Sequence, residues 1–156
     1  MHFGFSYVGL IFLILLFLPN LLWTKYKPKD YEKYAAHENK LLLVLERIGE
    51  VTVSALVLIF SDFNFRGLSL WAIWFFLACG CMLLYEIYWL RYFRSQRTMQ
   101  DFYRDLFGIP VAGASLPVFG FLLLGIYGKN VFLILAVTLL GVGHIGIHLC
   151  HKKEIT

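Results

Sequence analysis

Five runs of about twenty apolar residues, separated by short polar segments, constrain this chain more than any other feature. The hydrocarbon core of a bilayer is about 30 Å thick, so a helix needs roughly 20 apolar residues to cross it. Hydrophobic residues make up 60% of the 156 residues and charged residues only 15%, whereas soluble domains average about 25% charged residues. The sequence therefore predicts one all-α integral membrane domain, residues 1–156, folded as a bundle of five transmembrane helices. The expected spans are residues 3–23, 41–60, 70–90, 109–127 and 131–150.

The segments between the runs are too short to hold a soluble catalytic domain, so we expect the protein to act in or at the membrane. No basic residue precedes the first run and no small-residue cleavage site follows it. We therefore expect a retained helix, kinked at Pro19, rather than a signal peptide. Three cysteines, Cys79, Cys81 and Cys150, lie inside apolar runs, and we interpret them as small apolar residues rather than as disulfide partners.

The lysine and arginine residues are distributed unevenly among the loops. Three segments are rich in them, namely the loop after the first run, the loop after the third run and the tail: Lys25, Lys27, Lys29, Lys33, Lys40; Arg91, Arg94, Arg97, Arg104; Lys152, Lys153. The other two loops carry only Arg66 and Lys129. Positively charged loops mark the cytoplasmic side of a membrane protein. The pattern predicts an N-terminus outside and a C-terminus inside.

This orientation also explains the charge of the protein. The net charge of +4 reflects topology, so we expect the lipid bilayer as a partner and no nucleic acid. The expected location is a cell membrane crossed several times, specifically the cytoplasmic membrane of a bacterium.

Two of the basic segments carry signals of short helices. Asp30 is a candidate N-cap, and Thr98 with Asp101 resembles a capping box within a segment that mixes arginines with aromatic residues. We expect an interfacial cytoplasmic helix between spans three and four that anchors the protein among lipid headgroups. Only residues 128–130 separate spans four and five, which predicts a tight antiparallel hairpin.

Ionisable residues interrupt three of the runs, always in the half nearest the basic loops. At about 1.5 Å per residue they lie roughly 6 to 15 Å inside the cytoplasmic boundary. Charges at such depths are costly unless they face protein or water, and they are functional candidates by default. The second span carries Glu46, Arg47 and Glu50, the third carries Glu86, and the fifth carries His144 and His148.

The charges of these groups do not balance, because three carboxylates face the single deep cation Arg47. Protons, protonated histidine, a metal ion or a cationic ligand must therefore compensate the remaining negative charge. Our leading hypothesis is a ligand-binding or proton-transfer site in the cytoplasmic half. Its core is Glu50, Glu86 and His144, supported by Glu46, Arg47 and His148. Such a site binds, and transports or modifies, a small or lipid-like molecule, which leaves open whether the protein is an enzyme.

Two other interpretations remain open. His144 and His148 are four residues apart, so they share a helix face and could hold a divalent metal such as zinc, completed by His151 or a neighbouring glutamate. The alternative function is therefore that of an intramembrane metal-dependent enzyme. We expect His151 itself at the membrane interface. In the third interpretation the protein is a non-catalytic membrane subunit whose polar residues hold its helices together or bind a partner or another copy.

Scattered positions resemble two kinds of membrane enzyme. The histidine pair at 144 and 148 resembles the pair on the last helix of ceramidase-like and adiponectin-receptor-like hydrolases. The acidic residues at 46, 50 and 86 resemble those on the second and third helices of five-helix sterol isomerases. These likenesses cover isolated positions only, and we transfer no activity from them.

Overall fold

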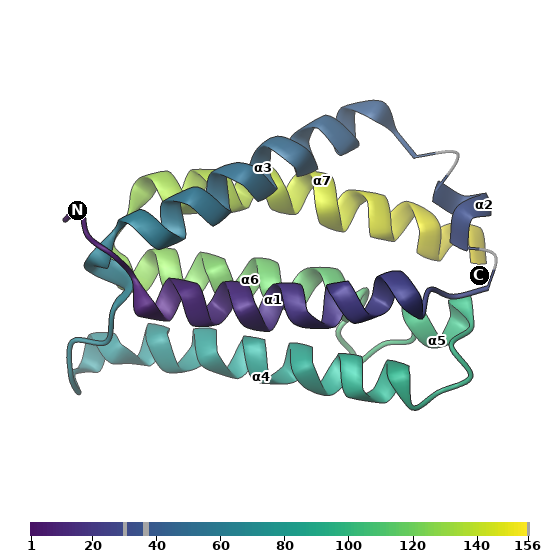
Figure 1. Cartoon of the computed structure of the whole chain (residues 1–156), viewed down its shortest axis with the longest axis horizontal. Coiled ribbons are helices and arrows are strands. Elements are labelled where there is room, and N and C mark those ends of the chain that lie inside the picture. Colours follow the sequence, from purple (N-terminus) through teal and green to yellow (C-terminus); the bar gives the residue numbers. More distant parts are fainter. Residues whose placement is uncertain (30, 36–37, 156) are drawn as a thin grey trace.

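The computed structural model describes residues 1–29, 31–35 and 38–155, and in these residues it contains helices and no β-strand. Five long helices lie side by side along one axis (Figure 1). They are α1 (Tyr7–Lys25), α3 (Lys40–Ile59), α4 (Ile73–Phe93), α6 (Ala112–Gly128) and α7 (Val131–Ile155). The shorter elements are α2 (Tyr31–Ala35), α5 (Met99–Tyr103) and two 3₁₀ turns, η1 (Ser61–Phe63) and η2 (Leu70–Ala72). The cap expected at Asp30 lies outside the described residues.

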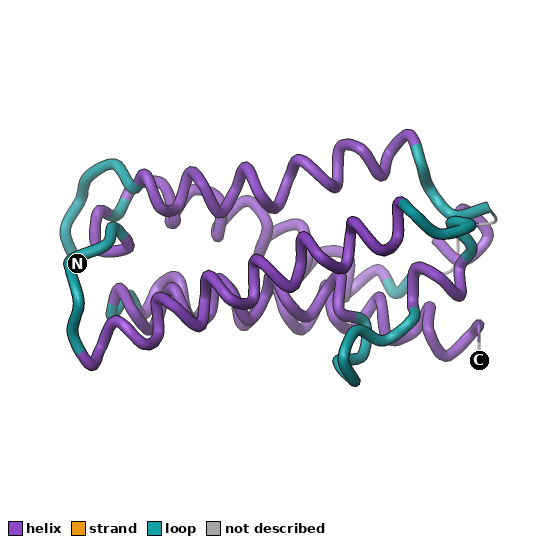
Figure 2. The backbone as a smooth tube through the Cα atoms, turned by 90° about the horizontal axis from the view of Figure 1, so that it is seen from below, coloured by secondary structure: helices purple, strands orange, loops and turns teal. Residues whose placement is uncertain are grey.

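The five long helices correspond to the five apolar runs, and consecutive long helices run in opposite directions (Figures 1 and 2). In the described part of the chain, three helices are long and apolar enough to cross a membrane: Tyr7–Lys25, Leu70–Phe93 and Val131–Ile155. α6 is a shorter apolar helix, and α3 carries the charged residues of the second run. The chain is therefore an all-helical protein with the features of a membrane protein.

Helix α3 packs along α7, α4 packs along α6, and α6 in turn packs against α7. Glycines allow the closest of these approaches. A Cβ atom added to Gly49 of α3 would lie 2.6 Å from the Cα atom of Leu140, and one added to Gly143 of α7 would lie 2.5 Å from the backbone nitrogen of Glu46. Small residues let helix backbones approach closely, so this seam fixes α3 against α7.

The hairpin between α6 and α7 forms as predicted. α6 ends at Gly128, Lys129 adopts a left-handed conformation with φ 51°, and α7 begins at Val131. The side-chain oxygen of Asn130 accepts a hydrogen bond from the Leu133 backbone N–H, which satisfies one of the free donors at the start of α7.

Helix α5 has the predicted capping box. The Thr98 hydroxyl accepts a hydrogen bond from the Asp101 backbone N–H, and the Asp101 carboxylate accepts one from the Thr98 backbone. However, α5 is only five residues long, and Phe102 and Tyr103 are buried in the bundle. The Tyr88 hydroxyl donates a hydrogen bond to the Phe102 carbonyl oxygen. This segment therefore turns its aromatic side chains into the protein rather than outward.

Candidate functional site

A cavity of about 240 Å³ lies among α1, α3, α4, α6 and α7, toward the end of the bundle that holds α2 and α5. It exists because α1 and α3 diverge. At one end Gly9 packs so closely against the Val57 carbonyl that no side chain would fit between them, and the two helices separate toward the other end (Figure 1). The polar residues in the cavity wall are Asn20, Tyr31, Glu38, Glu46, Arg47, Glu50, Ser54, Tyr85, His144 and His148.

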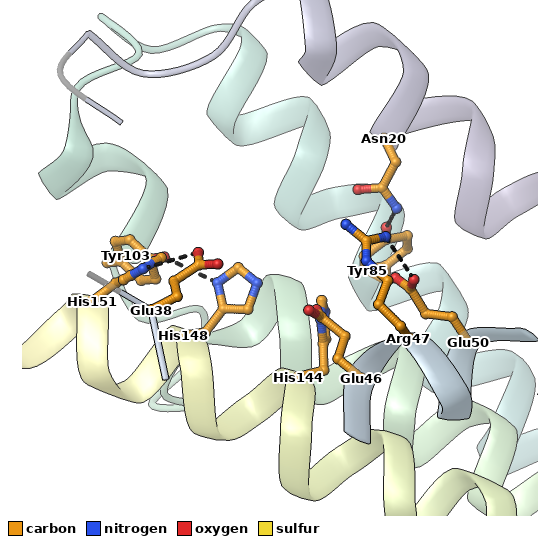
Figure 3. A network of polar contacts seen from close by, with 10 residues as sticks. All are labelled: Asn20, Glu38, Glu46, Arg47, Glu50, Tyr85, Tyr103, His144, His148 and His151. Atoms are coloured by element: carbon orange, nitrogen blue, oxygen red, sulfur yellow. Dashed lines mark hydrogen bonds and ion pairs between the residues drawn. The ribbon is translucent and has the colours of Figure 1, made fainter. Parts of the chain in front are cut away.

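The innermost polar pair is Glu46 of α3 with His144 of α7. The His144 Nδ1 atom lies 2.5 Å from the Glu46 Oε1 atom (Figure 3), and the Glu46 side chain is largely buried. The close approach at Gly143 places Glu46 directly opposite this part of α7. The structure therefore joins two of the residues predicted from the sequence, on different helices.

Arg47 and Glu50 form a second pair within α3. The Arg47 Nη1 atom donates a hydrogen bond of 3.0 Å to the Glu50 carboxylate. Their side chains are 75% and 43% exposed, so they lie at the rim of the cavity rather than in its interior. Because this pair is exposed, it lies farther from the interior of the cavity than Glu46 does.

Asn20 of α1 and Tyr85 of α4 close the opposite wall. The Asn20 amide donates to the Tyr85 hydroxyl oxygen at 3.0 Å and to the Leu16 carbonyl oxygen at 2.8 Å. These bonds orient both side chains at the cavity wall (Figure 3).

Glu86 was predicted to be part of the core of the site, but it is not among the residues that line the cavity. Tyr85 and Trp89, four residues apart on α4, face the cavity, and Glu86 is turned about 100° away from Tyr85 around the helix. Its Oε1 atom is buried without a hydrogen-bond partner among the described residues. Glu50 reaches only the rim, so Glu46 takes the place that the sequence interpretation gave to Glu50 and Glu86.

Beyond His144, a chain of polar contacts runs along α7 toward its C-terminal end (Figure 3). The rings of His144 and His148 lie 4.7 Å apart between centroids. The Tyr103 hydroxyl is 3.1 Å from Nδ1 of His148 and 2.9 Å from Nδ1 of His151. His151, expected at the depth of the membrane interface, is only 2% exposed, because α2 and α5 cover it.

This series of polar contacts ends at Glu38, in the segment that precedes α3. The His151 Nε2 atom lies 3.2 Å from the Glu38 Oε1 atom, although the ring N–H is not aligned for a hydrogen bond. The contact becomes an ion pair when the ring is protonated. Burial and the nearby Glu46 raise the pKa of Glu38, while Arg47 acts in the opposite direction. Burial, with Glu38 and Glu46 nearby, also raises the pKa of Tyr31 to about 12.

The zinc hypothesis required a third ligand beside His144 and His148. Among residues 1–29, 31–35 and 38–155, no group of three or more His, Cys, Asp or Glu side chains is arranged to hold a metal ion. His148 and His151 are instead bridged by Tyr103, and His144 is paired with Glu46.

The sequence interpretation missed Glu38, Tyr103 and Asn20. A usable signal existed for the first two, because both lie in the basic segments at the same end of the bundle as His151. The expected depths of Glu38 and Tyr103 are similar to that of His151. A comparison of these depths, like that of Glu50 with His144, would have placed the three residues near one another. For Asn20, the sequence gives no comparable indication of its partner.

Comparison of the chain with models of protein families, with curated proteins and with solved structures yields no match. The function must therefore be argued from the geometry of the cavity.

Proposed function

We propose that the chain is a five-span membrane protein, with its N-terminus outside and its C-terminus in the cytoplasm of a bacterium, whose cavity binds a small organic cation with an apolar body. The observation that carries this proposal is the composition of the cavity wall, which combines excess carboxylates with aromatic rings. Transport or modification of that molecule would follow from binding.

The charge of the wall favours a cation. Glu38, Glu46 and Glu50 line the cavity, and Arg47 is the one lysine or arginine side chain among the described residues that line it. A buried carboxylate requires a compensating charge or a proton. An ammonium group beside Glu46 would supply that charge.

The rest of the wall favours an apolar body with aromatic contacts. Aromatic rings from several helices line the cavity: Phe17, Trp23, Tyr31, Tyr85, Trp89, Phe102 and Phe121. Aromatic faces attract organic cations, the interaction that recognises quaternary ammonium groups. The buried Nε1 atom of Trp23 has no hydrogen-bond partner among the described residues, so it can donate to an oxygen atom on the ligand. At about 240 Å³ the cavity suits a molecule smaller than a typical drug.

The divergence of α1 and α3 supplies an entrance. Leu16 and Phe17 of α1 and Leu43 of α3 line the cavity where the two helices separate, and the outer surfaces of these helices carry exposed apolar residues such as Leu18 and Val44. Apolar exposure of this kind suits contact with lipid tails. We infer that an amphiphilic ligand enters sideways from the bilayer, past the Arg47–Glu50 pair.

Neither alternative is favoured by a specific contact. The metal-dependent reaction lacks a third ligand among the described residues. The structural interpretation does not account for a cavity lined by three carboxylates and one arginine.

Binding can be tested with benzyltrimethylammonium, a water-soluble aromatic cation, added to the protein in lipid nanodiscs. We expect saturable quenching of the fluorescence of Trp23 and Trp89, and none from benzyl alcohol, which has the same ring without the charge. Glu46→Gln should raise the dissociation constant roughly tenfold to a hundredfold, which is the effect expected when a hydrogen bond to a charged group is lost. Glu50→Gln, at the rim, should weaken it less.

Glu86→Gln is the matched control, since it removes a carboxylate in the same half of the bundle but outside the cavity. Its affinity should equal that of the wild type. Equal losses in Glu46→Gln and Glu86→Gln, or no saturable binding to a folded wild-type protein, would refute the proposal.

A further inference from the structure

An open groove of about 390 Å³ lies between α1 and α4, at the end of the bundle where both helices finish (Figure 1). Its walls are Leu22 and Tyr26 at the C-terminal end of α1, Phe93 at the end of α4 and Arg97 in the loop that follows α4. We call it the α1–α4 groove. It shares no lining residue with the cavity described above, so it is a separate place on the molecule.

Two positive charges converge on one aromatic ring of this groove. The guanidinium carbon of Arg97 lies 5.1 Å from the centroid of the Tyr26 ring, and the Lys25 ammonium nitrogen lies 5.7 Å from it. Both distances are within the range of cation–π attraction. The backbone at Tyr26 is itself held to α4, because the Tyr92 hydroxyl donates a hydrogen bond of 2.7 Å to the Tyr26 carbonyl oxygen. The groove therefore carries two cations from two different segments.

These two cations have no carboxylate partner among the residues that the structure describes. Asp101 is the acidic residue closest in sequence to Arg97, but its carboxylate accepts hydrogen bonds from the backbone N–H and the hydroxyl of Thr98. Arg94, which is exposed at the C-cap of α4, adds a third positive charge nearby. Like charges repel one another, so an anion bound between Lys25 and Arg97 would lower the electrostatic energy of this region.

The backbone of Arg97 is in a left-handed conformation, with φ 56°. Glycine adopts this conformation without steric cost and asparagine tolerates it, whereas a long side chain there costs conformational energy. Strained positions of this kind cluster at binding sites, where the surrounding structure holds them in place. A glycine would make the same turn between α4 and α5 at lower cost but would supply no cation. The strain therefore points to a role for the guanidinium group of Arg97.

The apolar part of the groove favours a lipid over a free anion. Leu22 and Phe93 form apolar walls beside the two cations. One helical turn toward the middle of the bundle, Leu18 of α1 and Leu90 of α4 are exposed, and exposed apolar side chains of this kind suit contact with acyl chains. Basic pockets between transmembrane helices on the cytoplasmic side bind the headgroups of anionic lipids. Positive charge beside an apolar surface matches the two parts of a phospholipid.

We propose that the α1–α4 groove binds one anionic phospholipid. The Arg97 guanidinium group donates two hydrogen bonds to oxygen atoms of the lipid phosphate, the Lys25 ammonium group adds a second positive charge, and an acyl chain lies along Leu22 and Phe93. The lipid bridges the end of α1 and the loop after α4, so it holds α1 against α4. This proposal requires the end of the bundle with the basic segments to lie at a membrane surface, but it does not depend on a cation in the cavity.

Native mass spectrometry of the full chain in detergent tests the proposal, because it counts the lipids that remain bound. The probes are dioleoylphosphatidylglycerol, which is anionic, and dioleoylglycerol, which has the same acyl chains without the phosphate. We expect one molecule of the phospholipid to bind saturably and dioleoylglycerol to bind far more weakly. The phospholipid should also raise the unfolding temperature, since a ligand that binds only the folded state stabilises it.

Two exposed variants remove the proposed contacts. Lys25→Gln and Arg97→Asn should each raise the dissociation constant of the phospholipid about fivefold, the effect of one basic residue near an anionic lipid. Asparagine suits the left-handed backbone at position 97, so this variant keeps the turn. Lys153→Gln is the matched control, since it removes an exposed lysine of α7 at the same end of the bundle but outside the groove. Its dissociation constant should stay within about twofold of the wild type, because distant exposed charges are screened.

Four results would overturn the proposal. Equal losses in Lys25→Gln, Arg97→Asn and Lys153→Gln would show a general attraction to the charge of this end rather than a site. Wild-type affinity in folded Lys25→Gln and Arg97→Asn would remove the role of the two cations. Equal binding of dioleoylglycerol would remove the role of the phosphate. Inorganic phosphate that binds as tightly as the phospholipid would show that the groove holds a free anion and not a lipid.

Discussion

Neighbouring residues on α3 have opposite surroundings. Glu46 is largely buried and pairs with His144 across the seam with α7, whereas Arg47, the next residue, is exposed and pairs with Glu50 on its own helix. The change of about 100° per residue around a helix explains the difference. Charge at a given depth is therefore not enough to define the site, because the direction of each side chain decides which charges meet.

Glu38 provides a stability prediction at this scale. Because burial and Glu46 raise its pKa in the folded protein, the ionised carboxylate costs folding free energy. Below the unfolded value of 4.5 the group is protonated in both states and the cost is absent. The cost grows as the pH rises through the higher folded pKa. We expect Glu38→Gln to unfold at a higher temperature than the wild type at neutral pH and at the same temperature near pH 4.

Thermal unfolding in detergent across this pH range measures the effect. Glu32→Gln, an exposed glutamate on α2, is the control and should follow the wild type throughout. A destabilised Glu38→Gln at neutral pH would show that the contact with His151 outweighs the cost. The expected gain in stability fits a carboxylate kept for function at the expense of folding.

At the scale of elements, the seam between α3 and α7 determines whether the site exists. Gly49 and Gly143 bring the two backbones together, and Glu46 and His144 lie beside these positions. By contrast, α1 approaches α3 closely at Gly9 and then departs from it. One tight and one open contact of the same helix therefore produce both the paired carboxylate and the space beside it.

Gly143→Ala tests the seam. The added Cβ would meet backbone atoms of Leu42 and Glu46, so the helices must move apart, at a cost of about 1–3 kcal/mol typical of overpacking. We expect a lower unfolding temperature and weaker cation binding. Gly80→Ala on α4 is the control, since a Cβ there meets nothing within 4 Å and stability should be unchanged or slightly higher. Equal behaviour of the two variants would contradict the role of the seam.

At the scale of the whole molecule, the two ends of the bundle differ in charge. Of the 14 lysine and arginine residues, only Arg47, Arg66 and Lys129 lie away from the end that holds α2, α5 and the C-terminus. Arg66 packs over the ring of Tyr127, and the Lys129 ammonium group lies 4.9 Å from the ring of Trp71. Aromatic rings of this kind are enriched at both membrane interfaces. The proposed cytoplasmic C-terminus therefore depends on the charge asymmetry alone.

Reporter fusions test this orientation. A fluorescent protein that matures only in the cytoplasm should fluoresce when it is joined to the C-terminus, and alkaline phosphatase inserted between Arg66 and Ser69 should be active outside. Inactive phosphatase at that position together with a dark C-terminal fusion would show that the orientation is opposite to the one proposed. Phosphatase activity of an insertion at residues 105–108 would contradict the five-span count.

Most of the secondary structure could be predicted from the sequence because its causes are local. Helix positions follow from runs of apolar residues, the capping box of α5 from Thr98 and Asp101, and the hairpin from the short link before Val131. The proposed orientation likewise depends on the distribution of charge along the chain. The capping box and the hairpin depend on residues within one or two turns of one another, and each helix depends on the composition of a single run of the chain.

The composition of the site could be predicted only in part. The sequence placed Glu46 and His144 at similar depth, but it did not show that they would meet, or that Glu86 would face away from the cavity. A pattern of apolar residues defines the faces of a helix, whereas the rotation of that helix against its neighbours depends on packing, here on Gly49 and Gly143. Tyr103, His151 and Glu38 come from three separate segments, and only the tertiary structure brings them together, because no local periodicity relates them.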